Sequence, residues 1–399
     1  MRPTTVLIRI SGADRPGITA GLLAIIARHD ADVLDMEQIV VRDRLTLDVL
    51  VSAAEDTGLL KELLYYGWEK TISVDFEMVD DEASEPTGPR FAVSVIGPEL
   101  RPQSLAGVTE AIAAGGANID RIIQLSREPV VSYEFIVSSG EADKIREALW
   151  HVAAEHSIDV AMQREGLGRR AKRLVVLDVD STLVQGEIID RLAEAAGVGQ
   201  AVAAITDRAM AGEIDFEEAL RDRVAALAGL DHATLDMVAQ DIALTPGART
   251  FVRTLKRLGY TVAAVSGGFD VFVERLKATL ELDHVFANKL EIRDGKLTGG
   301  IVGTLIDGAT KADVLRQVAA AEGIPIEQTV AVGDGANDVD MLAAAGLGIA
   351  FNARPVVRQA ADTALNVPYL DAVLFLLGIR RDDIDEADAV DPPPSGDGH

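Results

Sequence analysis

LVVLDVDST, residues 174–182, runs from an apolar segment into two aspartates and two hydroxyl side chains. A short, continuous apolar run that ends in polar residues is typical of a strand buried on both faces of a parallel sheet. Asp178 and Asp180 lie one residue apart, and like charges this close need a neutralising group, such as a hard divalent cation. A surface loop that contains D-x-D by chance is the alternative interpretation of these nine residues alone.

Three later segments extend the pattern. Residues 261–265 are apolar and lead into S-G-G at 266–268, and residues 329–332 lead into G-D-G-A-N-D at 333–338. Between them, Lys311 lies early in a helical pattern. In a doubly wound parallel sheet, ligands gather at the carboxyl ends of the strands, where these residues would fall. The sequence therefore predicts an α/β fold with one site assembled from four separate segments.

The residue types at this site suit phosphoryl transfer, which needs a nucleophile, a proton carrier and donors for the phosphate oxygens. Asp178 is the candidate nucleophile, and Asp180 is the candidate proton donor and acceptor. Lys311 is expected to tie Asp178 to the phosphate. Ser266 and the amide of Gly267 are expected to supply neutral donors to the substrate, because glycine allows close approach of the backbone.

Oxygen ligands for a metal lie in the same segments. Asp178, Asp334 and the backbone carbonyl of Asp180 together offer the ligands that Mg²⁺ prefers. Asp338 is expected to be an outer ligand that holds metal-bound water, and Asn337 to contact the substrate. The sequence predicts Mg²⁺ as the cofactor.

In this order, the four segments resemble the motifs of the haloacid dehalogenase-like phosphatase superfamily, over about residues 173–379. The resemblance implies a doubly wound Rossmann-like catalytic domain with a small helical cap at about residues 185–244. Asp180 favours the hydrolase branch over the dehalogenase and ATPase branches. Residues 178–187, DVDSTLVQGE, are similar to the opening of phosphoserine phosphatases. That family hydrolyses O-phospho-L-serine through an aspartyl-phosphate, as the last step of serine biosynthesis.

The resemblance also implies how the two charged ends of phosphoserine are held. Glu187 is expected to receive the ammonium group and Arg223 to grip the carboxylate in a bidentate pair. Met210 and Phe216 match apolar cap positions that exclude water. Arg223 follows Phe216 by seven residues, as in the family. Spacing alone favours an exposed helical arginine and a plain core phenylalanine, and the family resemblance reverses this preference.

The first half of the chain contains two copies of one pattern. Residues 1–80 and 90–164 each begin with an apolar strand, a polar loop and a helix, and then alternate through two strands, a helix and a last strand. The order β-α-β-β-α-β is that of a ferredoxin-like α+β module. Both copies resemble ACT domains, which bind amino acids. Residues 81–89 are the expected linker between the copies, and residues 166–172 the expected solvated hinge to the catalytic region.

The ACT resemblance implies that an amino-acid effector, with serine as the leading candidate, binds around the first loop and helix of each module. The implied effector residues are Asp14, Gly17, Ile18, Asp32, Gly107 and Asn118. The second copy departs from the pattern, because Gln103 stands where the first has Gly17. Modules that only mediate formation of a homodimer are the alternative.

Composition limits the remaining functions. The 399 residues carry a formal net charge of -26 and no cysteine, which argues against nucleic acid or anionic membrane partners and excludes disulfides and thiol chemistry. No leader or membrane-length apolar run is evident, so we expect a cytoplasmic protein. Residues 382–399 are acidic and proline-rich at the end, which predicts a disordered tail. Two other functions remain open: hydrolysis or transfer of another small phosphate, and amino-acid sensing with a vestigial phosphatase site.

Overall fold

The computed structural model describes residues 4–53, 57–79 and 88–392. The chain divides into two compact units, Met1–Thr87 and Gly88–His399, and each is described by itself. Most of the linker expected at residues 81–89 lies outside the described residues. No helix in the described part of the chain is long and apolar enough to cross a membrane.

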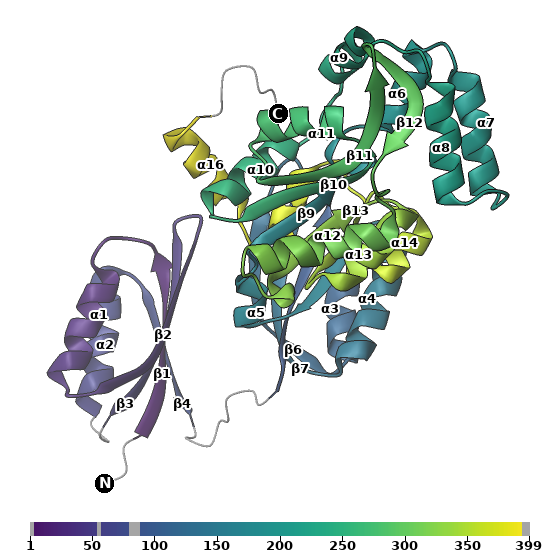
Figure 1. Cartoon of the computed structure of the whole chain (residues 1–399). Helices are drawn as coiled ribbons and strands as arrows, with labels where there is room; N and C mark the ends of the chain where they lie inside the picture. The colour runs from purple at the N-terminus through teal and green to yellow at the C-terminus, as the bar shows by residue number, and fades with distance from the viewer. Residues whose placement is uncertain (1–3, 54–56, 80–87, 393–399) are drawn as a thin grey trace. The chain divides into compact units, whose positions relative to one another are not determined.

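The first unit is a four-stranded antiparallel sheet with both helices on one face (Figure 1). Its elements are β1 (Thr4–Ala13), α1 (Ile18–Arg28), β2 (Asp32–Val41), β3 (Arg44–Ala53), α2 (Thr57–Lys70) and β4 (Ser73–Val79). The strand order is β2-β3-β1-β4. Alternate residues of β1 and β3, such as Ile8 and Val49, are fully buried against the helices, as the period-2 pattern requires.

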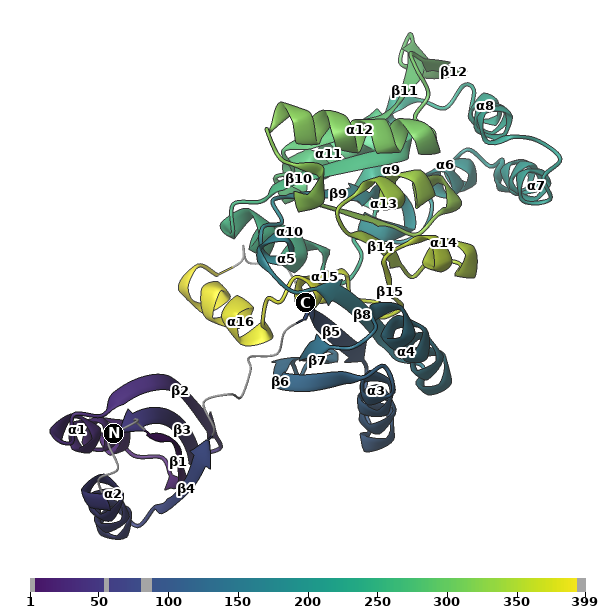
Figure 2. The ribbon, with the colours of Figure 1, turned by 90° about the horizontal axis from the view of Figure 1, so that it is seen from below.

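The second unit begins with a module of the same architecture. Its elements are β5 (Arg90–Gly97), α3 (Pro102–Ala114), β6 (Ala117–Ser126), β7 (Val131–Ser139), α4 (Ala142–His156) and β8 (Asp159–Arg164). The strand order β6-β7-β5-β8 repeats that of the first unit, and Figure 2 shows α3 and α4 side by side. The predicted pair of ferredoxin-like modules is confirmed.

A seven-stranded sheet forms the rest of the second unit, in the order β12-β11-β10-β9-β13-β14-β15. All neighbours are parallel except β11 and β12, which form an antiparallel hairpin. The strands are β9 (Leu174–Asp178), β10 (Thr261–Phe269), β11 (His284–Arg293), β12 (Lys296–Val302), β13 (Thr329–Gly333), β14 (Gly348–Phe351) and β15 (Thr363–Leu365). The helices outside the cap are α5 (Leu167–Arg170), α10 (Ala248–Arg257), α11 (Asp270–Leu280), α12 (Gly308–Ala321), α13 (Val339–Ala344), α14 (Pro355–Ala360), α15 (Val373–Leu376) and α16 (Arg381–Val390).

Both faces of this sheet are covered. Val175 and Leu177 of β9 pack into a core that includes α10, α11 and α15, whereas Leu174 and Val176 pack into a second core with α12, α13 and α14. This is why β9 is a continuous apolar run rather than an alternating one. The predicted doubly wound parallel sheet is confirmed.

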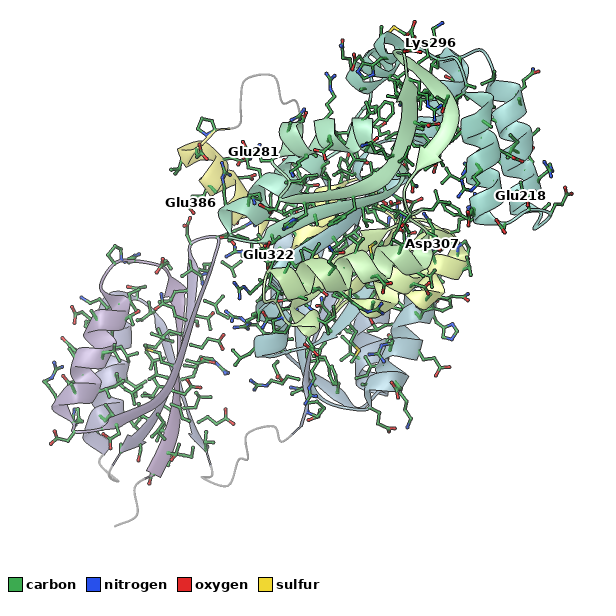
Figure 3. All side chains as sticks on the ribbon, viewed as in Figure 1. Glu218, Glu281, Lys296, Asp307, Glu322 and Glu386 are labelled. Atoms are coloured by element: carbon green, nitrogen blue, oxygen red, sulfur yellow. The ribbon has the colours of Figure 1, made fainter. Side chains whose placement is uncertain are left out.

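Four helices inserted between β9 and α10 form the cap. They are α6 (Ile188–Ala195), α7 (Gly199–Met210), α8 (Phe216–Ala226) and α9 (His232–Gln240). The loop between α8 and α9 is bonded to the β11–β12 hairpin: Gly229 N–H donates to Leu297 O at 2.8 Å, and Leu297 N–H donates to Leu230 O at 2.8 Å. Lys296 lies at the tip of this hairpin (Figure 3). This hairpin was not predicted from the sequence.

The prediction of a disordered tail at residues 382–399 is wrong for its first part, which lies in helix α16. Ile384 is buried at 2% exposure in the core that includes α10, α11 and α15. Asp388 accepts hydrogen bonds from Arg253 Nη2, at 2.7 Å, and from Arg257, both on α10. Acidic residues of α16 thus find cationic partners, which a solvated tail lacks. The final residues of the predicted tail lie outside the described part of the chain.

The basic segment 166–172 is not a solvated hinge. Arg169 is buried and forms ion pairs with Glu134 of the module and with Glu165. Lys172 Nζ donates to Glu327 O at 2.6 Å. Buried charges of this kind are stable only when paired, so the segment is a fixed connection between the second module and the parallel sheet.

Candidate active site

Three strand ends meet at one edge of the parallel sheet. β9 lies between β10 and β13, with Asp178 opposite Val265 and Leu177 opposite Val332. The chain leaves β9, passes to β10 on one side and returns to β13 on the other, so this is the point where the strand order reverses. Ligands bind at such a switch point.

Lys311 joins two of the predicted segments. Its side chain is fully buried, and Nζ donates to Asp178 Oδ1 at 2.6 Å and to Asp338 Oδ1 at 2.7 Å. Burial alone would lower the pKa of Lys311, but the charges of Asp178 and Asp338 raise it above its ordinary value. Burial, and then the charge of Asp338, raises the pKa of Asp178 well above its ordinary value, although Lys311 opposes this. The cluster holds more negative than positive charge.

The excess negative charge fits a divalent cation. Carboxylate oxygens of Asp178, Asp334 and Asp338 lie within 4.8 Å of one another. Thr182 Oγ1 donates to Asp334 Oδ1 at 3.0 Å, and burial, followed by the charge of Asp338, raises the pKa of Asp334 to about 6. Hard oxygen ligands around a buried site suit Mg²⁺. Asp338 is already engaged on both oxygens, by Lys311 and by Gly335 N–H at 2.9 Å, which suits the outer position expected for it.

Asp180 makes a different set of contacts from Asp178. Its Oδ1 accepts a hydrogen bond from Ile188 N–H, the first residue of α6, at 2.8 Å, and its Oδ2 accepts one from Ser266 Oγ at 3.0 Å. Ser181 has a φ of 58°, so the chain turns sharply after β9. The two aspartates therefore have separate environments, as two separate chemical roles require. Burial raises the pKa of Asp180.

The cap region contains two of the predicted substrate residues, Glu187 and Arg223. The pKa of Glu187 is raised to about 7, first by burial and then by the charges of Asp180 and Asp334, while the charge of Arg223 lowers it. Arg223 Nε donates to Ala219 O at 3.3 Å, which leaves the outer guanidinium nitrogens for another partner. The charge of Arg223 therefore acts on the Glu187 carboxylate.

Phe216, Gly267 and Asn337 also converge. A Cβ atom on Gly267 would lie 3.4 Å from Phe216 Cζ and 3.8 Å from Asn337 Nδ2. Phe216 is exposed at 37%, so it is not the plain core residue that spacing alone allowed. Met210 ends α7, but its side chain lies outside the described residues.

Two residues at the site had no assigned role in the sequence analysis. Thr182 belongs to the quoted DVDST segment, and its position beside the aspartates was the available signal. Asn288, in β11, is 1% exposed and bonded to the Gly267 carbonyl. Nothing in its sequence neighbourhood distinguishes it, because its partners are backbone groups far away in the chain.

The predicted effector residues fall into two groups. In the first unit, Asp14 and Asp32 are exposed and Ile18 is buried. Gly17, at the start of α1, has a φ of 93° and no atom within 4 Å of a Cβ position, so this loop leaves room for a ligand.

In the second module, Gly107 lies against α4, where a Cβ atom would be 3.1 Å from Val152 Cγ1 and 3.3 Å from His156 Nε2. Helix packing therefore accounts for this glycine. Asn118 Nδ2 donates to Asp120 Oδ1 at 3.2 Å. The effector roles of Gly107 and Asn118 stay predictions.

Comparisons with known families match all three folded regions. Residues 175–343 match the family model of haloacid dehalogenase-like hydrolases. Residues 4–77 and 90–163 each match a model of ACT domains.

Curated relatives match over nearly the whole chain. A phosphoserine phosphatase from Streptomyces coelicolor is 50% identical over 390 residues, which cover 97% of this chain and 95% of that protein. Phosphoserine phosphatase SerB2 from Mycobacterium tuberculosis is 48% identical over 393 residues, covering 97% and 96%. Among solved structures, the unliganded crystal structure of a probable phosphoserine phosphatase from Vibrio cholerae is 35% identical with a TM-score of 0.59. It covers 75% of this chain and 89% of that one.

Proposed function

Because this chain belongs to the phosphoserine phosphatases of the haloacid dehalogenase-like hydrolase family, we propose that it hydrolyses O-phospho-L-serine to serine and phosphate. We infer that this reaction is the last step of serine biosynthesis, as the family resemblance implies. The main observation that supports this mechanism is that buried Lys311 pairs both with Asp178, at the end of β9, and with Asp338.

In the first step, a carboxylate oxygen of Asp178 attacks phosphorus, and the bond between phosphorus and the serine oxygen breaks. Asp180 gives its proton to the departing oxygen, so serine leaves as a neutral alcohol. The raised pKa of Asp180 supports this role, because part of the population is protonated at a higher pH than usual. Lys311 holds Asp178 in line for the attack.

In the second step, water attacks the phosphorus of the aspartyl-phosphate on Asp178. Asp180 takes the proton from that water, the bond between phosphorus and Asp178 breaks, and inorganic phosphate is released. The Gly267 amide donates to the phosphate oxygens, and Ser266 Oγ does so when its hydrogen turns from Asp180 Oδ2 to the substrate. Mg²⁺, held by Asp178, Asp334 and the backbone carbonyl of Asp180, would neutralise charge on the phosphoryl group.

Selection of phosphoserine is assigned to the cap. Arg223 has unused guanidinium nitrogens for the substrate carboxylate, and Glu187 can accept its ammonium group. Phe216, beside Gly267, covers the phosphate position and excludes water. A substrate that lacks one charged end would leave Arg223 or Glu187 without its partner, and this loss provides the selectivity.

Phosphate release from a panel of small phosphomonoesters, with Mg²⁺ present, tests this function. We expect phosphoserine to be preferred, Asp178→Asn to be inactive and radioactive phosphate to be trapped on the wild-type protein only. Preference for another ester would indicate a related phosphatase or phosphotransferase. A protein inert towards the whole panel would point to a sensor with a vestigial site, and unchanged rates in Asp178→Asn would contradict the covalent mechanism.

Regulation is proposed to reside in the ACT modules, with serine as the effector and a homodimer as the assembly. The open loop at Gly17 supports binding in the first unit, because a helix start with an accessible backbone attracts a carboxylate. Free serine should change the rate of the wild-type protein, and Asp14→Ala should weaken this response. The exposed Asp30→Ala is the matched control. Identical serine responses in all three proteins would exclude the Gly17 loop as the serine-binding site. Analytical ultracentrifugation would test whether the protein is a dimer.

A further inference from the structure

Asn288 connects two of the catalytic segments through its side chain. It is 1% exposed. Its Nδ2 donates to the carbonyl oxygen of Gly267 at 2.8 Å, and its Oδ1 accepts a hydrogen bond from Ile306 N–H at 2.8 Å. Both halves of the amide are therefore committed to backbone groups, and a buried amide with both ends satisfied is held rigidly.

The first of these bonds fixes one peptide plane. The carbonyl of Gly267 is held by Asn288, and the N–H on the other side of the same peptide, that of Gly268, donates to Ser266 Oγ at 2.7 Å. Ser266 Oγ in turn donates to Asp180 Oδ2 at 3.0 Å. Glycine has the widest choice of backbone conformations, so a pair of glycines needs such external constraints to keep one orientation.

The second bond reaches the helix that carries Lys311. Ile306 directly precedes Asp307, which is labelled in Figure 3. The Asp307 side chain caps α12 by accepting a hydrogen bond from Thr310 N–H at 2.8 Å. Lys311 N–H donates to Asp307 O at 3.0 Å. Asn288 therefore sets the spacing between the Gly267 peptide and the start of α12. A displacement of either would separate the phosphate donors from Lys311.

The chemistry of this position requires an amide. The Gly267 carbonyl needs a donor and the Ile306 N–H needs an acceptor, which asparagine offers together on one planar group. An aspartate would place a second oxygen against the Gly267 carbonyl, and a leucine would satisfy neither group.

We propose that Asn288 is a positioning residue for phosphoryl transfer, which holds the Ser266–Gly267–Gly268 backbone in register with Lys311. It acts through the backbone and does not touch the substrate. The inference rests on the proposed phosphatase function. We assign Asn288 to the chemical step and not to recognition of serine, because its side chain is bonded to Gly267 and Ile306 and not to Glu187 or Arg223.

The test compares Asn288→Asp and Asn288→Leu with wild type, by measuring kcat, KM for phosphoserine and thermal melting with Mg²⁺ present. A misplacement of catalytic groups by about 1 Å costs on the order of 100-fold in rate, so we expect kcat to fall about 10- to 100-fold. KM should change by less than about threefold, because binding of the serine end is untouched.

Thr329→Val is the matched control. Thr329 is fully buried, donates to Ile326 O at 2.7 Å and accepts from Gly346 N–H at 3.1 Å, at the opposite end of the sheet. This variant should melt at a lower temperature and keep its kcat. If kcat falls equally in Thr329→Val, or if folded Asn288→Asp keeps the wild-type kcat, the positioning role is wrong. Asn288→Asp is nearly isosteric and decides the question if Asn288→Leu fails to fold.

A wild-type protein that does not hydrolyse phosphoserine would refute the proposed function. This outcome differs from one in which wild type is active and Asn288→Asp keeps its kcat, which would refute only the positioning role.

Discussion

Replacement of Lys311 by methionine should show how strongly the stability of the protein depends on the balance of charges at the site. Lys311 is the partner of two buried carboxylates, those of Asp178 and Asp338, and Asp334 lies within reach of both. Methionine has a similar length and no charge, so the variant keeps much of the packing and leaves the carboxylates to repel one another. The matched variant, Asp178→Asn, removes one negative charge and leaves Lys311 paired with Asp338.

The expected effects differ strongly between the two variants. Loss of one partner from a buried ion pair costs about 3–5 kcal/mol, and about 2–4 °C of melting temperature accompanies each kcal/mol in a unit of this size. Lys311→Met should therefore melt on the order of 10 °C lower than wild type. Asp178→Asn should melt at or above the wild-type temperature, because burial and Asp338 already disfavour the Asp178 charge.

The pH dependence has a definite sign. Without Lys311, the carboxyl pKa values in the folded protein rise further above their ordinary values near 4, whereas those of the unfolded chain do not change. The folded variant then binds more protons than the unfolded chain, so its stability falls as pH rises through this window. The melting deficit of Lys311→Met should grow between pH 5 and pH 8.

Thermal melting in a chelator, followed by titration with Mg²⁺, measures these effects. Added Mg²⁺ should raise the melting temperature of Lys311→Met more than that of wild type, because the cation replaces the missing positive charge. Equal melting temperatures for Lys311→Met and wild type in chelator would refute the charge argument, as would a destabilised Asp178→Asn.

Three further predictions concern the cap and α16. Arg223→Ala should raise KM for phosphoserine by about 100-fold, and raise it much less for p-nitrophenyl phosphate, which has no carboxylate; equal losses would contradict carboxylate binding. In wild type, KM for phosphoserine should fall from pH 6 to pH 8 as Glu187, with its pKa of about 7, ionises, and Glu187→Gln should abolish that part of the pH profile. Asp388→Asn should lower the free energy of unfolding by about 1 kcal/mol, whereas the exposed Glu386→Gln (Figure 3) should not lower it. Because the pKa of Asp388 is lowered in the folded protein, the stability difference between Asp388→Asn and wild type should vanish as the pH falls through that pKa.

The candidate site was predictable because its residues stand where the apolar pattern stops. Asp178 follows four apolar residues of β9, and parallel strands bring their carboxyl ends to one edge. The contacts of Lys311 with Asp178 and Asp338 follow from that topology, and the two ferredoxin-like modules follow from alternation and repetition. In each case, the signal lies within a few neighbouring residues.

The features that the sequence analysis missed depend on partners distant in the chain. Residues 382–390 are acidic and by composition resemble a solvated tail, but Asp388 meets Arg253 and Arg257, more than 130 residues earlier. Asn288 bonds to backbone groups of Gly267 and Ile306, which carry no side-chain signature. A single sequence reports local periodicity and composition, and it does not report which distant groups neutralise or satisfy a residue.

The proposed recognition of the substrate and the proposed transfer of the proton are linked through one helix end. Glu187, the candidate for the substrate ammonium, directly precedes Ile188, whose N–H binds Asp180 at 2.8 Å. Any shift of α6 that accompanies binding at Glu187 would therefore move a hydrogen bond on Asp180, the proposed proton carrier. Because Asp180 also accepts a bond from Ser266, the same shift reaches the backbone that donates to phosphate. A ligand that fills the cap incorrectly would leave both the acid and the donors out of place, so selectivity and rate depend on the same contacts.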